Sequence, residues 1–112
     1  MKVYVAGPYT VGDIACNVAK NIRIGDKLLK LGYTPFVPLL THFWHILYPN
    51  HYDVWMDYDE KWVLSCDVLL RTPGESSGAD KEVKLAIAHN IPVVYSVAEL
   101  LRKYPIDIKG KP

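Results

Sequence analysis

Apolar residues along this chain follow two spacings in turn. Short runs that are apolar at nearly every position are typical of strands buried in a parallel sheet, and they lie at residues 2–6, 33–37, 67–70 and 92–95. Between these runs, apolar residues recur every three or four positions, which is the spacing of one face of a helix. The pattern predicts helices from Ile14 to about Gly32, over 54–66, over the segment that follows Ser77, and over 97–104.

Strands that alternate with helices imply a parallel sheet with right-handed crossovers. We therefore expect an α/β fold, a single-domain doubly wound parallel sheet of four to five strands in a flavodoxin- or Rossmann-like three-layer sandwich. Pro35 inside the second strand places that strand at a sheet edge, because proline cannot donate a ladder hydrogen bond. Pro38 begins an aromatic stretch that runs to His51, and we expect this stretch to be irregular.

Length and charge narrow the class of protein. The 112 residues fit one domain with one core, with residues 106–112 as a loose tail. A net charge of +1 without a basic stripe argues against a nucleic acid polymer as partner. No apolar run approaches membrane length, so we expect no membrane association. Cys16 and Cys66 are isolated, which gives no support for a disulfide framework or a zinc site, and we expect a cytoplasmic location.

The loop of small residues over 71–82 follows a predicted strand and opens a predicted helix. Open α/β sheets place their ligands at such strand ends, and the hydroxyls and amides of a helix start can receive an anion. We expect Ser77 to cap this helix, with Asp80 three residues later completing a capping box. Glu82 then lies beyond the first turn among apolar residues, where capping does not account for it.

Asp59 breaks an apolar pattern in the same way. In the predicted helix over 54–66 it shares a stripe with Trp55 and Trp62. A partly desolvated carboxyl group has a raised pKa and can act as a general acid near neutral pH. Alternatively, Asp59 hydrogen-bonds a loop amide or an indole. Two inward carboxyl groups on neighbouring helices indicate acid and nucleophile chemistry on a bond such as a glycosidic bond.

Three blocks of sequence resemble the nucleoside 2-deoxyribosyltransferase superfamily, which includes deoxynucleoside 5'-monophosphate N-glycosidases. They are VYVAGP at 3–8, DEKWVLSCD at 59–67, and PGESSGADKEVKLA at 73–86, which is followed by IPVV at 91–94. The resemblance implies that Glu82 is a nucleophile toward the anomeric carbon and that Asp59 protonates the departing base. It also implies that Tyr4 orients the nucleophile and that the loop at Gly7 and Pro8 approaches the sugar.

The resemblance further implies a small-molecule nucleoside or nucleotide as partner, no cofactor, and a homodimer or higher oligomer. Ser76 matches a serine of the phosphate-accepting members, and Ser77 and Gly78 would add donors beside it. The segment 39–51 would line or cover the base pocket, with His42 touching a base or ribose hydroxyl. Its aromatic residues Phe43, Trp44 and Tyr48 would offer stacking faces, or else pack against the helix over 54–66.

The sequence is compatible with other functions. The same fold could carry a catalytically silent nucleotide-binding module, because a fold does not fix a function. A flavin- or dinucleotide-binding protein is also compatible with the loop, although the Gly-x-Gly-x-x-Gly pattern is missing after the first strand. The histidines at 42, 45 and 51 with Asp53 match no zinc spacing, so we expect no metal. The sequence does not identify the base, the sugar or the acceptor.

Overall fold

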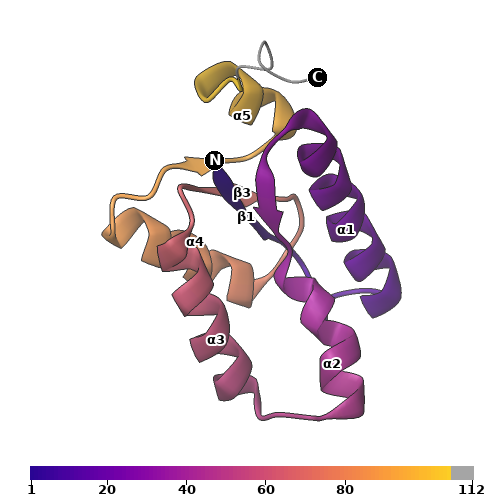
Figure 1. Cartoon of the computed structure of the whole chain (residues 1–112). Coiled ribbons are helices and arrows are strands. Elements are labelled where there is room, and N and C mark those ends of the chain that lie inside the picture. Colours follow the sequence, from indigo (N-terminus) through magenta and orange to yellow (C-terminus); the bar gives the residue numbers. More distant parts are fainter. Residues whose placement is uncertain (107–112) are drawn as a thin grey trace.

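The computed structural model describes residues 1–106, and within them the chain forms one parallel sheet of four strands (Figure 1). The strands are β1 (Lys2–Ala6), β2 (Thr34–Phe36), β3 (Val68–Arg71) and β4 (Val93–Val94), in the spatial order β2-β1-β3-β4. The chain leaves β1 toward one edge and later returns to the other side of β1. The sheet is therefore doubly wound, as the sequence pattern predicts.

Helices cover both faces of the sheet. They are α1 (Ile14–Leu31), α2 (Thr41–Leu47), α3 (Tyr52–Ser65), α4 (Ser77–Ala88) and α5 (Val97–Lys103), with a short 3-10 helix η1 (Pro38–Leu40) before α2. One apolar cluster joins Val3 and Val5 to Leu28 of α1 and Leu100 of α5. The expected three-layer sandwich is confirmed, because a second cluster lies on the opposite face.

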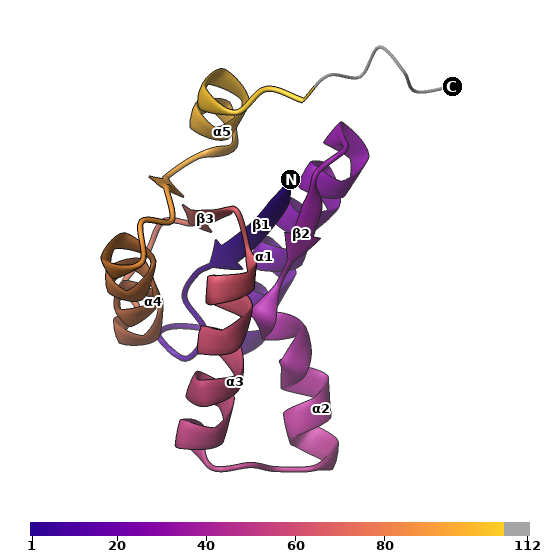
Figure 2. The same cartoon turned by 60° about the vertical axis from the view of Figure 1, so that its left-hand side comes forward.

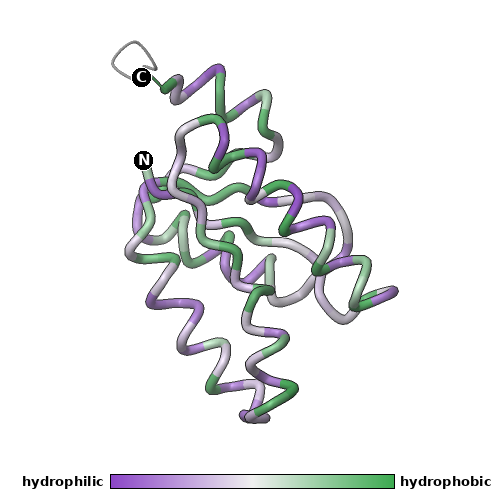
Figure 3. Tube along the Cα trace, turned by 45° about the vertical axis from the view of Figure 1, so that its right-hand side comes forward, coloured by the Kyte–Doolittle hydropathy of each residue, from purple (hydrophilic) through white to green (hydrophobic). Residues whose placement is uncertain are grey.

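The second cluster joins Tyr4 and Leu69 to Val63 of α3 and to Ala79 and Ala86 of α4. Successive side chains of a strand point to opposite faces, so β1 supplies residues to both clusters. Figure 3 shows the result as hydrophobic strands in the middle of the molecule, between helices of mixed polarity. Tyr4 pairs in register with Phe36 of β2 and Leu69 of β3, which places it at the centre of the sheet.

Several predicted boundaries are confirmed. β1 has the predicted bounds, and β2 is an edge strand, as expected from Pro35. Gly32 ends α1 in the left-handed conformation at φ 104°, and its amide donates to the carbonyls of Leu28 and Leu29. The predicted tail over 106–112 lies, from residue 107 on, outside the described residues.

The prediction of an irregular segment from Pro38 to His51 is wrong, because most of it is helical in η1 and α2. Phe43, Ile46 and Leu47 do recur at the spacing of one helix face, but none of the side chains of α2 is buried, so this face takes no part in the core. Together, α2 and the first half of α3 project beyond the sheet (Figures 1 and 2). No helix within residues 1–106 is both long and apolar enough to cross a membrane.

Candidate active site

A cavity of about 580 Å³ lies at the carboxyl end of the sheet. Its walls come from the segments after β1 and β2, from α2, from the first half of α3 and from the start of α4. The chain reverses direction across the sheet between β1 and β3, which is where doubly wound folds place their ligands. The cavity takes in most of the predicted site residues: Gly7, His42, Asp59, Ser76, Ser77, Gly78 and Glu82.

Glu82 is held in the wall of this cavity by a hydrogen bond from the sheet. Its side chain is only 6% exposed, and the fully buried Tyr4 hydroxyl donates a hydrogen bond to Oε2 of Glu82. The pKa of Glu82 is raised to about 7, mainly by burial and also by the nearby Asp59, although the Tyr4 bond and the Arg71 charge act in the opposite direction. Burial and the Glu82 carboxylate keep the pKa of Tyr4 well above its usual value, so Tyr4 remains a donor.

Asp59 reaches the same cavity from α3. Burial raises the pKa of its carboxyl group to about 7. Its Oδ1 atom is buried and has no hydrogen-bond partner among the described residues. The sequence also allowed a hydrogen bond from an indole to Asp59. The Trp55 indole does not form it, because it donates to His45 instead.

The neighbours of the two carboxyl groups decide how they share protons. The Asp59 charge raises the pKa of Glu82, so ionising both groups together is unfavourable. A carboxylate is favoured where donors meet it, and Glu82 has the Tyr4 hydroxyl and the Arg71 charge. Oδ1 of Asp59 has no hydrogen-bond donor beside it in the described residues. The arrangement can therefore supply an ionised nucleophile at Glu82 and a proton donor at Asp59.

The start of α4 differs from the prediction by one residue. Ser76, not Ser77, is the N-cap, because its Oγ accepts the Ala79 amide at 3.1 Å. The Asp80 amide donates to the Ser76 carbonyl. In residues 1–106, the amides of Ser77 and Gly78 have no hydrogen-bond partner, as expected for the first turn of a helix. These amides lie where an anionic group can be received.

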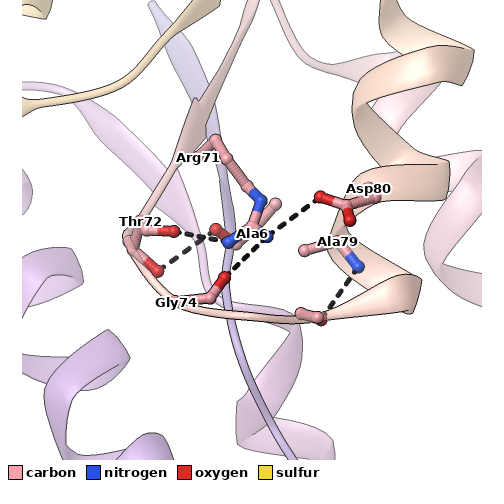
Figure 4. A network of polar contacts seen from close by, with 7 residues as sticks. Ala6, Arg71, Thr72, Gly74, Ala79 and Asp80 are labelled. Atoms are coloured by element: carbon pink, nitrogen blue, oxygen red, sulfur yellow. Dashed lines mark hydrogen bonds and ion pairs between the residues drawn. The ribbon is translucent and has the colours of Figure 1, made fainter.

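Asp80 has a different role from the predicted capping box. It forms an ion pair with Arg71 at 3.0 Å, and the Arg71 guanidinium also donates to the carbonyls of Thr72 and Gly74 (Figure 4). The Thr72 amide donates to the Ala6 carbonyl at 2.8 Å. This network ties the loop after β3 to β1 and to the first turn of α4. Sequence reasoning did not assign a role to Arg71; its position at the end of an apolar run was the available signal.

Close packing around position 7 leaves room only for a glycine. A Cβ atom at this position would lie 2.1 Å from Oγ1 of Thr72 and 2.4 Å from Oδ1 of Asn21, closer than real contacts allow. Both of those side chains are buried. Pro8 lies outside the set of cavity-lining residues, and its ring is the nearest group to a Cβ added at Gly74. The structure thus places Gly7 at the cavity and Pro8 against the loop after β3.

The aromatic residues at the cavity are not the ones proposed as stacking faces. Phe43, Trp44 and Tyr48 are exposed and do not line it. Trp44 packs edge-on against Trp55 and Tyr58 of α3 instead, which agrees with the alternative that these aromatics contact the helix. The cavity is lined by aromatic and sulfur-containing residues that the sequence analysis did not assign to it: Tyr9, Tyr52, Trp55 and Met56.

Two histidines of α2 line the cavity and are hydrogen-bonded. Nδ1 of His42 lies 2.5 Å from the Tyr9 hydroxyl. Nδ1 of His45 lies 2.8 Å from the Trp55 indole nitrogen and 3.2 Å from the Asn50 amide. The described part of the chain contains no cluster of three or more His, Cys, Asp or Glu side chains that could hold a metal.

Comparison with solved structures shows the fold. A 2-deoxyribosyltransferase from the psychrotolerant bacterium Bacillus psychrosaccharolyticus is similar over 83% of this chain and 69% of its own, with 19% identity and a TM-score of 0.59. A conserved protein from Enterococcus faecalis V583 is similar over 93% of this chain and 76% of its own, with 17% identity and a TM-score of 0.66. No protein-family model matches the sequence, and no curated protein matches it significantly. The chain thus has the fold seen in a 2-deoxyribosyltransferase.

Proposed function

We propose that this protein cleaves or transfers at the N-glycosidic bond of a nucleoside, a deoxynucleoside or their 5'-monophosphates. The observation that carries the proposal is the pair of carboxyl groups in one cavity, of which Glu82 has a donor from the sheet and Asp59 Oδ1 has no described partner. A glycosidic bond needs a nucleophile at carbon and a proton at the leaving group. The fold shared with a 2-deoxyribosyltransferase supports this chemistry.

In the proposed reaction, a Glu82 oxygen attacks the anomeric carbon as the carbon–nitrogen bond breaks. The electron pair of that bond goes to the base nitrogen, which takes the proton of Asp59. The result is a glycosyl ester on Glu82, a free base and an Asp59 carboxylate. Water or a second base then attacks the same carbon and gives its proton to Asp59, which frees Glu82. Two displacements at one carbon retain its configuration in the transfer reaction.

Tyr4 supports the first step by positioning the nucleophile. Its hydroxyl holds Glu82 in one orientation and stabilises the ionised form. As the ester forms, Glu82 loses its charge, and the bond from Tyr4 weakens accordingly. Tyr4 is therefore a positioning residue, and none of these steps uses a cofactor.

The substrate class follows from the size of the cavity and from its polar ends. A volume of about 580 Å³ is in the range of small-molecule sites. The unpartnered amides of Ser77 and Gly78, with Lys81 on the same helix, would receive a 5'-phosphate, and a free nucleoside would leave them to water. The proposal covers both forms.

Base release tests the proposal. Purified protein is incubated with a panel of nucleosides and their 5'-monophosphates, and free base is measured by chromatography. We expect release by the wild type and at least a ~10³-fold loss in Glu82→Ala, since removing a covalent nucleophile removes the main path. Glu75→Ala is the matched control, because Glu75 is an exposed glutamate of the same loop. A protein that binds a nucleotide equally well with and without Glu82, and releases no base, would be a silent binding module.

A further inference from the structure

The neighbours of His45 make its Nδ1 atom a hydrogen-bond acceptor. Its Nδ1 atom accepts the Trp55 indole N–H at 2.8 Å and the Asn50 backbone N–H at 3.2 Å. Neither group can act as an acceptor, so Nδ1 must present a lone pair to both. In the neutral ring the proton then sits on Nε2.

The two donors also fix the orientation of the ring. Trp55 belongs to α3 and packs edge-on against His45 with the ring centroids 6.0 Å apart, while Asn50 lies in the segment between α2 and α3. His42, one turn earlier, is a useful contrast. Its Nδ1 faces the Tyr9 hydroxyl, which can donate or accept, so its tautomer is not fixed in this way.

The Nε2–H group of His45 is left for a ligand. The ring lines the cavity, and Nε2 has no hydrogen-bond partner within residues 1–106. Trp55, which holds the other side of the ring, is one helical turn before Asp59 on α3. Because Asp59 is the proposed proton donor to the leaving base, His45 lies on the base side of the cavity, whereas Ser77 and Gly78 lie at the start of α4.

We propose that His45 determines base specificity by donating a hydrogen bond from Nε2 to a carbonyl oxygen of the leaving base. A fixed N–H donor matches an oxo group and cannot pair with an exocyclic amino group, whose hydrogens are donors as well. The protein therefore prefers oxo bases over their amino counterparts. This inference rests on the proposed function, and it adds the class of base.

The first test reads the tautomer and needs no substrate. In ¹⁵N-labelled protein, long-range nitrogen–proton correlation spectra distinguish a protonated Nε2 from a protonated Nδ1. We expect the neutral ring of His45 to be protonated at Nε2, and we expect Trp55→Phe to lose this fixed pattern. A proton on Nδ1 of His45 in the wild type would overturn the inference and would leave the glycosidase proposal standing.

The second test compares deoxyinosine with deoxyadenosine, which carry an oxo and an amino group at the same position. We expect the wild type to favour deoxyinosine by about 10-fold or more in kcat/KM, as a site with a dedicated donor discriminates. In His45→Asn the amide oxygen can replace Nδ1 as acceptor for Trp55 and Asn50, but the Nε2 donor is lost. We expect this variant to lose ~10- to 100-fold on deoxyinosine and less than ~3-fold on deoxyadenosine.

A preference that stays unchanged in folded His45→Asn would overturn the inference. If no member of the panel of nucleosides and 5'-monophosphates releases its base, the proposed function fails, and calorimetric binding of deoxyinosine and deoxyadenosine decides the inference alone. Tighter binding of deoxyinosine that is lost in His45→Asn supports it. Equal binding of the pair, or binding of neither, overturns it.

Discussion

Glu82 and Asp59 both have a pKa raised to about 7, and burial is the main cause at each. What separates them is the contact that each oxygen makes. The Tyr4 hydroxyl donates a hydrogen bond to Glu82, whereas Oδ1 of Asp59 has no hydrogen-bond partner in the described residues. A nucleophile must be ionised and a general acid must be protonated, so a rate that needs both should rise and fall again around neutral pH.

Tyr4→Phe tests the contact at Glu82. Removing a donor to a carboxylate raises its pKa, so Glu82 becomes ionised only at higher pH. We expect the acid limb of the profile of kcat/KM against pH to move to higher pH, with a ~10- to 100-fold lower maximum. Tyr95→Phe, at an exposed tyrosine, should leave the profile in place. An acid limb that does not move in Tyr4→Phe would contradict the assignment.

Glu82→Gln tests the cost of the buried charge. A carboxyl group whose pKa is raised by folding stabilises the fold below its unfolded pKa, near 4.5, and this contribution is lost as pH rises through the folded value of about 7. Above pH 7 the wild type therefore holds a charge that glutamine does not carry. At pH 8 we expect the free energy of unfolding of Glu82→Gln to be about 1–3 kcal/mol larger than that of the wild type.

The difference between Glu82→Gln and the wild type should shrink toward pH 5, where Glu82 is protonated. Urea unfolding at both pH values measures it. A gain of the same size at pH 5 and pH 8 would show that the substitution acts through packing and not through the charge.

At the scale of elements, the loop between β3 and α4 sets where Glu82 lies. Arg71 and Thr72 tie this loop to β1 and α4 (Figure 4). Gly7 allows the loop after β1 to pack closely against Thr72. Gly7→Ala should force buried side chains apart and cost about 1–3 kcal/mol of unfolding free energy. Denaturant unfolding measures this cost.

Gly78→Ala is the control for Gly7→Ala. A Cβ atom at Gly78 would meet Oη of Tyr52 at an ordinary 3.6 Å, and alanine is the better helix former, so its stability should not fall. A Gly7→Ala variant as stable as Gly78→Ala would mean that the loops can separate without cost.

The sequence predicted the elements better than their contacts. Strands and long helices have a clear spacing, and inward carboxyl groups at Asp59 and Glu82 break that spacing visibly. In α2, Phe43, Ile46 and Leu47 follow the same helical spacing, but their side chains are exposed and form no part of the core. The Ser76 cap and the Arg71 ion pair depend on where one turn begins, which neighbouring serines do not settle from sequence. The His45 to Trp55 bond joins two helices, and only their packing reveals it.

In the molecule as a whole, α2 and the first half of α3 project beyond the sheet and expose many large apolar side chains. Those exposed by half or more are Phe43, Ile46, Leu47, Tyr48, Tyr52 and Val54. A net charge of +1 offers little repulsion between copies. We propose that a second copy of the chain covers this surface.

Light scattering after size exclusion tests the self-association. We expect the mass of a dimer or a higher oligomer for the wild type, and a shift toward monomer when Phe43 and Tyr48 are both replaced by lysine. Leu101→Lys, on the distant helix α5, is the control. A monomer at high protein concentration would contradict the proposal.

A bond between Glu82 and the sugar would be trapped in protein quenched during turnover, where mass spectrometry can detect it. We expect a peptide containing Glu82 that is heavier by one glycosyl group in the wild type, and no such peptide in Glu82→Gln. Base release that continues in Glu82→Gln, with no labelled peptide in the wild type, would contradict this mechanism.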